Sequence, residues 1–182
     1  HHLEDAVTNS LSFRLDEAAL HRRLADLGGP EKGLLADLLR SARASAPDKD
    51  VRRLSGFIEN ISVAASAMQH HVTALFSALR AFVLDTDSDI ASDYVTQLRI
   101  TPALRDRSAF TQVQNTWSIL KEFLDVIGEA LHHLTQALSR LEQYDLDDFE
   151  DLVSSLGAAA RYFDQVNSQV TAFVSEPDDN AI

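Results

Sequence analysis

The sequence predicts an all-α fold, an elongated antiparallel bundle of long, coiled-coil-like helices. Apolar residues recur at alternating steps of three and four over long stretches, which is typical of helices packed lengthwise on one another. Glycine and proline are scarce, at 6 and 4 of 182 residues, which favours helices over a turn-rich β fold. The hydrophobic content of 45% is enough to form a core, and the length indicates a single domain over residues 1–182.

The most regular apolar series starts at Phe110, includes Trp117 and ends at Leu141. This spacing predicts a helix whose buried stripe contains Trp117. Similar series predict two more long helices, so that three are expected in residues 48–182 and shorter ones in residues 1–47. The expected ranges are 16–27, 31–44, 52–84, 109–143 and 146–175.

Turn and charge signals separate these helices. Gly28-Gly29-Pro30 predicts a turn between the two short helices. Asp145 is expected to cap the last long helix, with acidic residues in its first turn, where they stabilise the positive end of the helix dipole. The stretch Asp85–Asp93 is interpreted as an acidic loop. Tyr94–Thr101, which ends at Pro102, is the one segment with strand-like alternation.

The net charge of −12 is unevenly distributed along the chain. Residues 1–57 hold nine basic and nine acidic side chains, whereas residues 58–182 hold seven and nineteen, five of them within Asp145–Asp151. Most of the surface is therefore expected to repel nucleic acid, and any anionic ligand should prefer the first third of the chain.

Two arginine clusters are the candidate DNA contacts. One contains Arg99, Arg105 and Arg107, and the other contains Arg52 and Arg53 with Arg40 and Arg43. Phosphate contacts require such clusters, and Tyr94 and Phe110 beside the first cluster could stack on unpaired bases. In the alternative interpretation, the arginines of the first cluster pair with Asp93, Asp106 and the acidic loop.

No motif predicts catalysis or a resident metal within the chain. There is no cysteine, phosphate-binding loop or Ser/His/Asp set. Glu129 and His132 have the spacing of a di-iron motif, but the helical period places them opposite the core stripe. The pairs His70-His71 and His132-His133 are accordingly interpreted as solvated surface residues, and no cofactor is expected in the chain itself.

The two ends of the sequence resemble part of a known family. His1 followed by Leu3-Glu4-Asp5-Ala6 resembles the end of an Asp-Glu-Ala-His box in the DinG branch of the XPD-like DNA helicases. Leu98–Thr101, the following Leu104-Arg105, and Phe173–Asn180 resemble the helical insertion of bacterial members of that family. The resemblance extends over the whole chain and rests on these short sequence segments.

The resemblance implies that the chain is the arch domain inserted in the motor of a cytoplasmic, ATP-dependent 5′-to-3′ DNA helicase. The motor would then be its partner in cis and would bind ATP and Mg²⁺, while the arch would help to frame single-stranded DNA. An iron–sulfur cluster of such a parent would use cysteines outside this sequence. The alternative is a stand-alone α-helical adaptor or protein-interaction module, in which His1–Glu4 is the remnant of an expression tag. Neither interpretation predicts a membrane-spanning segment.

Overall fold

The computed structural model describes residues 15–29, 31–86 and 102–175. In these residues the chain forms helices and no strand, which confirms the predicted all-α fold. The elements are α2 (Glu17–Leu27), α3 (Leu34–Ser45), α4 (Asp48–Thr86), α5 (Pro102–Arg105), α6 (Ser108–Arg140), the 3-10 turn η1 (Glu142–Tyr144) and α7 (Phe149–Val174).

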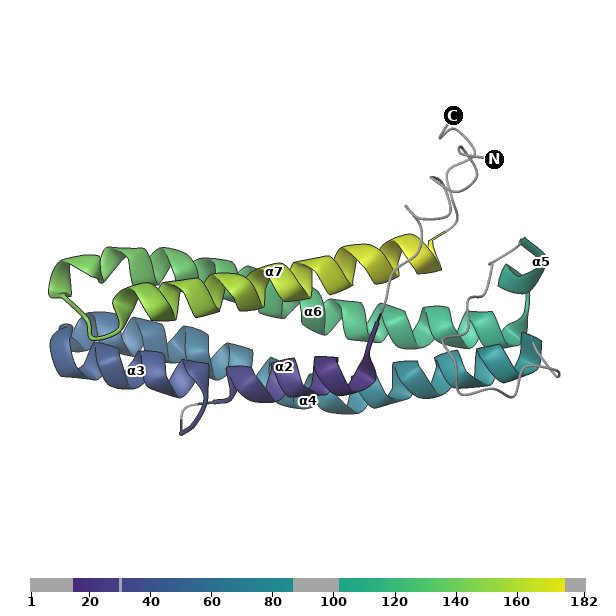
Figure 1. Cartoon of the computed structure of the whole chain (residues 1–182), viewed down its shortest axis with the longest axis horizontal. Helices are drawn as coiled ribbons and strands as arrows, with labels where there is room; N and C mark the ends of the chain where they lie inside the picture. The colour runs from purple at the N-terminus through teal and green to yellow at the C-terminus, as the bar shows by residue number, and fades with distance from the viewer. Residues whose placement is uncertain (1–14, 30, 87–101, 176–182) are drawn as a thin grey trace, which may run out of the picture.

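The helices form an elongated antiparallel bundle (Figure 1). The central pair is α4 and α6, in which residues 57, 71 and 82 of α4 face residues 133, 123 and 110 of α6. Helix α7 packs along α6, while α2 and α3 follow one another along α4 (Figure 1). Because α3 also contacts α7, and Arg23 of α2 lies over the ring of Tyr162 in α7, the bundle closes on itself. At a rise of about 1.5 Å per residue, the 39 residues of α4 extend about 58 Å.

The core follows the predicted apolar stripes. Trp117 is 3% exposed and Phe110 is completely buried, as the spacing of the α6 series predicts. Every member of the α6 series is buried, as are most members of the α4 and α7 series. Among the described residues, the buried side chains are all apolar. The central pair is therefore stabilised by shape complementarity and the hydrophobic effect, without polar contacts in its interior.

The predicted turn at Gly28-Gly29 lies between α2 and α3. Gly28 and Gly33 have φ angles of 67° and 92°, a region that side chains other than glycine rarely adopt. A Cβ atom at Gly28 would lie 2.0 Å from the carbonyl oxygen of Lys32, so the turn requires glycine there. At the other end of α2, the carboxylate of Asp16 accepts a hydrogen bond from the amide of Ala19, which caps the helix.

The expected capping role of Asp145 is wrong. Helix α7 begins at Phe149 and is preceded by Asp148, and Asp145 instead ends the 3-10 turn in a left-handed conformation with φ of 52°. The physical reason is Leu146, which is only 4% exposed. Burying this side chain between the two aspartates shifts the helix start by one turn. The first turn of α7 is nonetheless acidic, with Glu150 and Asp151, as predicted.

Two further predictions concern residues 85–101. Asp85 belongs to α4, which continues to Thr86, so the helix is longer than the acidic-loop interpretation allowed. The remainder of that loop and the strand-like segment Tyr94–Thr101 lie outside the described residues. Helix α4 also begins earlier than expected, at Asp48, because the carbonyl of Pro47 accepts hydrogen bonds from the amides of Asp50 and Val51.

Candidate functional site

The candidate arginines lie at opposite ends of the central helix pair. Arg105 and Arg107 are near the start of α6, whereas Arg52 and Arg53 are in the second turn of α4. Because the two helices are antiparallel, these positions are separated by almost the full length of the rod (Figure 1). Arg99 lies outside the described residues, as do His1 and Tyr94.

Arg105 is half-buried and holds the end of α7. Its guanidinium donates hydrogen bonds to the carbonyl oxygens of Val174, at 3.1 Å, and Phe173, at 3.3 Å. Its Cζ atom lies 5.3 Å from the centre of the Phe110 ring. Because the last carbonyls of a helix lack partners within the helix, a cation here satisfies them and stabilises the negative end of the dipole. The guanidinium of Arg105 is therefore engaged in bundle contacts.

Arg107 joins the end of α4 to the start of α6. Its Nη1 atom donates to the carbonyl oxygen of Asp85 at 2.8 Å and lies 3.2 Å from the Oδ2 atom of the same residue. For Arg107, this contact matches the alternative interpretation that the arginines of this cluster pair with the acidic stretch, of which Asp85 is the first residue. The expected stacking role of Phe110 is wrong, because its ring is buried between Phe82 and Phe173 and is closed to a base.

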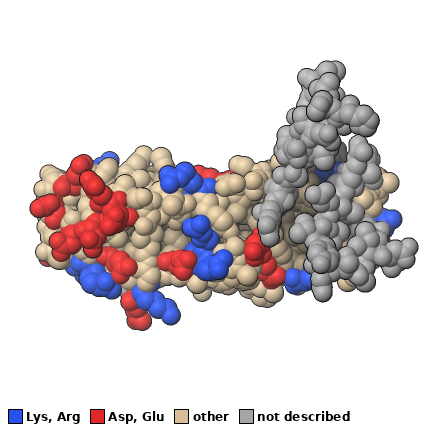
Figure 2. Space-filling view, in the orientation of Figure 1, with Lys and Arg blue, Asp and Glu red and all other residues tan. Residues whose placement is uncertain are grey.

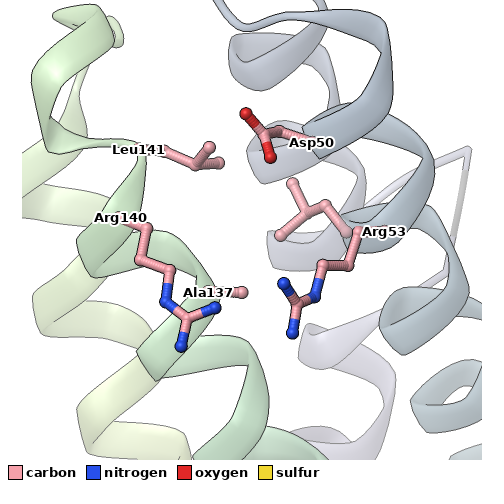
Figure 3. Close-up of a pocket in the computed structure, with 6 residues that line it drawn as sticks. Asp50, Arg53, Ala137, Arg140 and Leu141 are labelled. Carbon is pink, nitrogen blue, oxygen red and sulfur yellow. The ribbon is translucent and has the colours of Figure 1, made fainter.

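The opposite end of the rod contains a shallow groove between α4 and α6. This groove, called the arginine groove below, consists of two adjoining hollows. Arg53 and Arg140 line both hollows, and Ala137 lies between the two arginines (Figure 3). Figure 3 shows the two guanidinium groups pointing into the same space from opposite helices. Both side chains are exposed, so this space is open to solutes.

The arginines of the groove have no acidic partner in the described part of the chain. Asp50 lines the first hollow, but its Oδ2 atom accepts a hydrogen bond from the hydroxyl of Tyr144 at 3.2 Å. Partial burial, together with the charge of Asp50 and this hydrogen bond, raises the pKa of Tyr144 above its usual value. By contrast, Arg40 pairs with Asp37, at 2.8 Å, in α3.

Two histidine–aromatic stacks lie along the same α4/α6 surface. The ring of His133 stacks on Phe57 with centroids 6.0 Å apart, and His71 stacks on Phe123 at 4.9 Å. The second hollow contains both Phe57 and His133, so the first stack borders the arginine groove. The prediction of solvated histidine pairs therefore applies to His70, His132 and His133, which are exposed, and only in part to His71, which is half-buried.

The described residues show a strongly acidic surface beside this end of the rod. Asp and Glu side chains gather at the α6–α7 turn (Figure 2). The exposed acidic residues of this turn are Asp145, Asp147, Asp148, Glu150 and Asp151. The hydroxyl of Ser41 in α3 donates to the carbonyl oxygen of Asp147 at 2.8 Å, which holds the turn against the short helices. The arginine groove thus belongs to the same end of the bundle as the most acidic segment.

Glu129 and His132, the pair with di-iron spacing, belong to no group in the described residues that could hold a metal ion. Glu129 is exposed and lies 3.6 Å from His133, four residues further along α6. In residues 15–29, 31–86 and 102–175, no three His, Cys, Asp or Glu side chains lie close enough together to hold a metal ion. No helix within these ranges combines the length and apolar character needed to cross a membrane.

Comparisons with protein-family models, with curated proteins and with solved structures return no match for this chain. Functional inference therefore depends on the arginine groove and on the surfaces around it.

Arg140 is the residue of the candidate site that the sequence did not indicate. It is the last residue of α6, separated from Arg53 by more than eighty positions in the chain, and it belonged to no arginine cluster in the sequence. The signal that could have found it is the antiparallel pairing of the two longest helices. That pairing places the end of α6 beside the start of α4.

Proposed function

We propose that this chain acts as an arch-like helical insertion of a DinG-like, ATP-dependent 5′-to-3′ DNA helicase and helps to frame the single-stranded DNA. The observation that carries the proposal is the groove in which Arg53 and Arg140 converge without an acidic partner in the described part of the chain. Proteins bind the phosphates of nucleic acids mainly through positively charged side chains such as arginine, and a guanidinium without an acidic partner is available for such a contact. The neighbouring stack of His133 on Phe57 adds an aromatic surface beside them.

The shape of the molecule is compatible with this role. An insertion enters and leaves its host domain through nearby points. Helix α2 begins and α7 ends in the same half of the rod, while the α6–α7 turn forms the opposite end (Figure 1). The groove near that turn would then project away from the motor, where a guiding surface is needed.

The chain itself contributes no chemistry in this proposal. ATP and Mg²⁺ would be bound by the motor of the parent helicase, and the resemblance would make His1 the last residue of its Asp-Glu-Ala-His box. The 182-residue chain alone is accordingly expected neither to bind nor to hydrolyse ATP, with or without DNA. DNA-stimulated hydrolysis by the purified chain would contradict the proposal.

The decisive experiment uses the complete helicase. Changing Arg53 and Arg140 together to Glu should reduce unwinding more than it reduces DNA-free ATP hydrolysis, because only the strand contact is altered. The matched control changes Arg43 and Arg52 to Glu, since both are exposed and neither lines the groove. Equal unwinding by the two double variants would contradict a guiding role for the groove.

A second candidate function is that of a stand-alone helical interaction module. Ile119 and Val126, seven residues apart on one face of α6, are 47% and 50% exposed, and exposed apolar side chains on one helix face favour contact with another protein. The coding sequence immediately before His1 distinguishes the two functions. Asp-Glu-Ala at that place supports the helicase, whereas a tag sequence supports the module.

A further inference from the structure

The arginine groove has the chemistry of an oxyanion site. The guanidinium groups of Arg53 and Arg140 enter it from α4 and α6 and point toward one another (Figure 3). Two like charges that share one space repel each other, and an anion between them converts that repulsion into two attractions. The arrangement is therefore most favourable when the groove is occupied by an anion.

Some basic residues of the described chain are paired with carboxylates, whereas Arg53 and Arg140, like Arg43 and Arg52, are not. What sets Arg53 and Arg140 apart is that they converge on one hollow from two helices. The protein has a net charge of −12, and Arg80, Arg107 and Lys121 each lie within 4 Å of a carboxylate oxygen. Among the described residues, no carboxylate lies that close to Arg53 or Arg140, although Asp50 lines the same hollow. Asp50 instead accepts the hydrogen bond of Tyr144.

The floor of the groove is formed in part by apolar side chains. Leu54 and Leu141 are buried beneath it, and the small side chain of Ala137 leaves the space between the two guanidinium groups open. Packing of methylene groups on an apolar floor restricts a long side chain while its charged end remains in water. Both guanidinium groups thus lie beside one common ligand position above this floor.

We propose that this groove binds a phosphate group, with Arg53 and Arg140 on opposite sides of one tetrahedral oxyanion. A carboxylate has two oxygens, which a single arginine already satisfies in a bidentate pair, whereas a phosphate has enough oxygens for both guanidinium forks. The assignment of that phosphate to a single-stranded nucleic acid rests on the proposed function, but the site itself rests on the geometry of the groove.

The test follows the guanidinium Nε–Hε NMR signals of the 182-residue chain during titration with inorganic phosphate, at constant ionic strength maintained with sodium chloride. The signals of Arg53 and Arg140 should shift saturably. In each of Arg53→Gln and Arg140→Gln, the affinity should fall roughly tenfold, because one of two charge-assisted pairs is lost. Arg52→Gln is the matched control, since it removes an equal charge next to the site without changing the groove, and its affinity should match that of the unchanged chain.

A steric variant separates the site from the general field of positive charge. Ala137→Leu keeps both arginines and a good helix-forming residue but fills the space between them. It should abolish the saturable shift while circular dichroism confirms a folded bundle. If phosphate shifts the signals equally in Ala137→Leu, Arg53→Gln and Arg52→Gln, the effect is ordinary ion screening and the proposed site is wrong.

A second titration identifies the source of the phosphate, with a twelve-nucleotide single strand of thymidylate as the probe. If the strand shifts the same two signals and each Gln variant lowers the salt dependence of its binding by about one unit, the ligand is a strand phosphate. If inorganic phosphate binds but the strand leaves both signals unchanged, the site is one for free phosphate. That result would retain the site and remove the support that the groove lends to the helicase.

Discussion

The two ends of the α4/α6 pair hold the same type of side chain in opposite circumstances. At the start of α6, Arg105 and Arg107 donate to backbone carbonyls of α7 and α4. At the end of α6, Arg140 faces Arg53, and neither forms an ion pair with a carboxylate in the described part of the chain, although Asp50 lines the same hollow. Local sequence composition does not distinguish these cases, because both ends contain arginines close to several aspartates.

The difference arises from the backbone carbonyl groups that each helix end leaves without a hydrogen-bond partner. The carbonyls at the ends of α4 and α7 lie beside the start of α6, so nearby arginines satisfy them. At the opposite end, the final residues of α6 continue into a 3-10 turn that uses its own backbone groups, with the amide of Leu141 donating to Leu138. The arginines there are left available for a ligand. An arginine near a helix terminus is thus a candidate for ligand binding only if no free carbonyl group at a neighbouring helix end accepts its hydrogen bonds.

The largest expected effect concerns the aromatic cluster under Arg105. Phe110→Ala should lower the free energy of unfolding by about 3–5 kcal/mol, because it opens a cavity among buried side chains and removes the ring beneath the guanidinium. Urea denaturation measures this loss, and Trp117→Ala in the middle of α6 is the matched core control. A cost below about 1 kcal/mol would mean that this end is loosely packed.

A smaller loss is expected when Arg105 is changed while its apolar stem is retained. Arg105→Met should cost about 1.5 kcal/mol, because two charge-assisted hydrogen bonds to the end of α7 are lost while those carbonyls can still reach water. Hydrogen exchange should quicken in the last turn of α7 and stay unchanged at the start of α4. Unchanged exchange at both places would show that Arg105 does not hold α7.

The direct comparison of the two ends uses the same substitution at each. Arg107→Gln should cost about 0.2–1 kcal/mol, since its ion pair with Asp85 is solvent-screened. Arg53→Gln should change stability by less than about 0.5 kcal/mol in chloride, because no ion pair is lost. In phosphate, however, only Arg53→Gln should lose the ligand-dependent rise in Tm. Identical behaviour of the two variants in both salts would remove the distinction between the ends.

The smallest effect belongs to the middle of the rod, where a carboxylate links α6 to α7. Burial tends to raise the pKa of Asp125, but hydrogen bonds from Lys121 and Asn167 outweigh it and lower the pKa. The contribution of Asp125 to stability is therefore complete above the unfolded carboxyl pKa of about 3.9, and it is lost as the pH falls through the lower folded value. Asn167→Ala should raise the pKa of Asp125 in an NMR titration. An unchanged pKa would show that the hydrogen bond from Asn167 has no effect on it.

The helical period predicted the core well because burial repeats along a helix face. The α6 series from Phe110 to Leu141 is buried throughout, and Glu129 and His132 are exposed, as the same period requires. The position of Asp145 was mispredicted because the helix start depends on Leu146 reaching the core, which composition alone does not reveal. Local signals therefore identified the helices more reliably than their first residues.

The site was only partly predictable, since it depends on the register between distant helices. Arg53 was a candidate from its neighbour Arg52, but the structure places it opposite Arg140 in a different helix. Arg105 was also a candidate DNA contact, but in the structure its guanidinium is occupied by backbone carbonyls that lie almost seventy residues further along the chain. Periodicity within one helix does not specify which residues face one another across a pair, and function depends on that pairing.

The uniformly apolar interior of the described bundle has a mechanical consequence. Facing stripes of Leu, Ile and Val repeat with each turn, so a slide of α6 along α4 by one turn, about 5.4 Å, would again place apolar groups opposite apolar groups. The contacts that would be lost are residue-specific ones, such as the buried contact of Phe82 with Phe110 and the surface stacks of His71 on Phe123 and of His133 on Phe57. The rod therefore resists bending along its whole length, whereas its resistance to tension parallel to its axis is concentrated in a few aromatic contacts between α4 and α6.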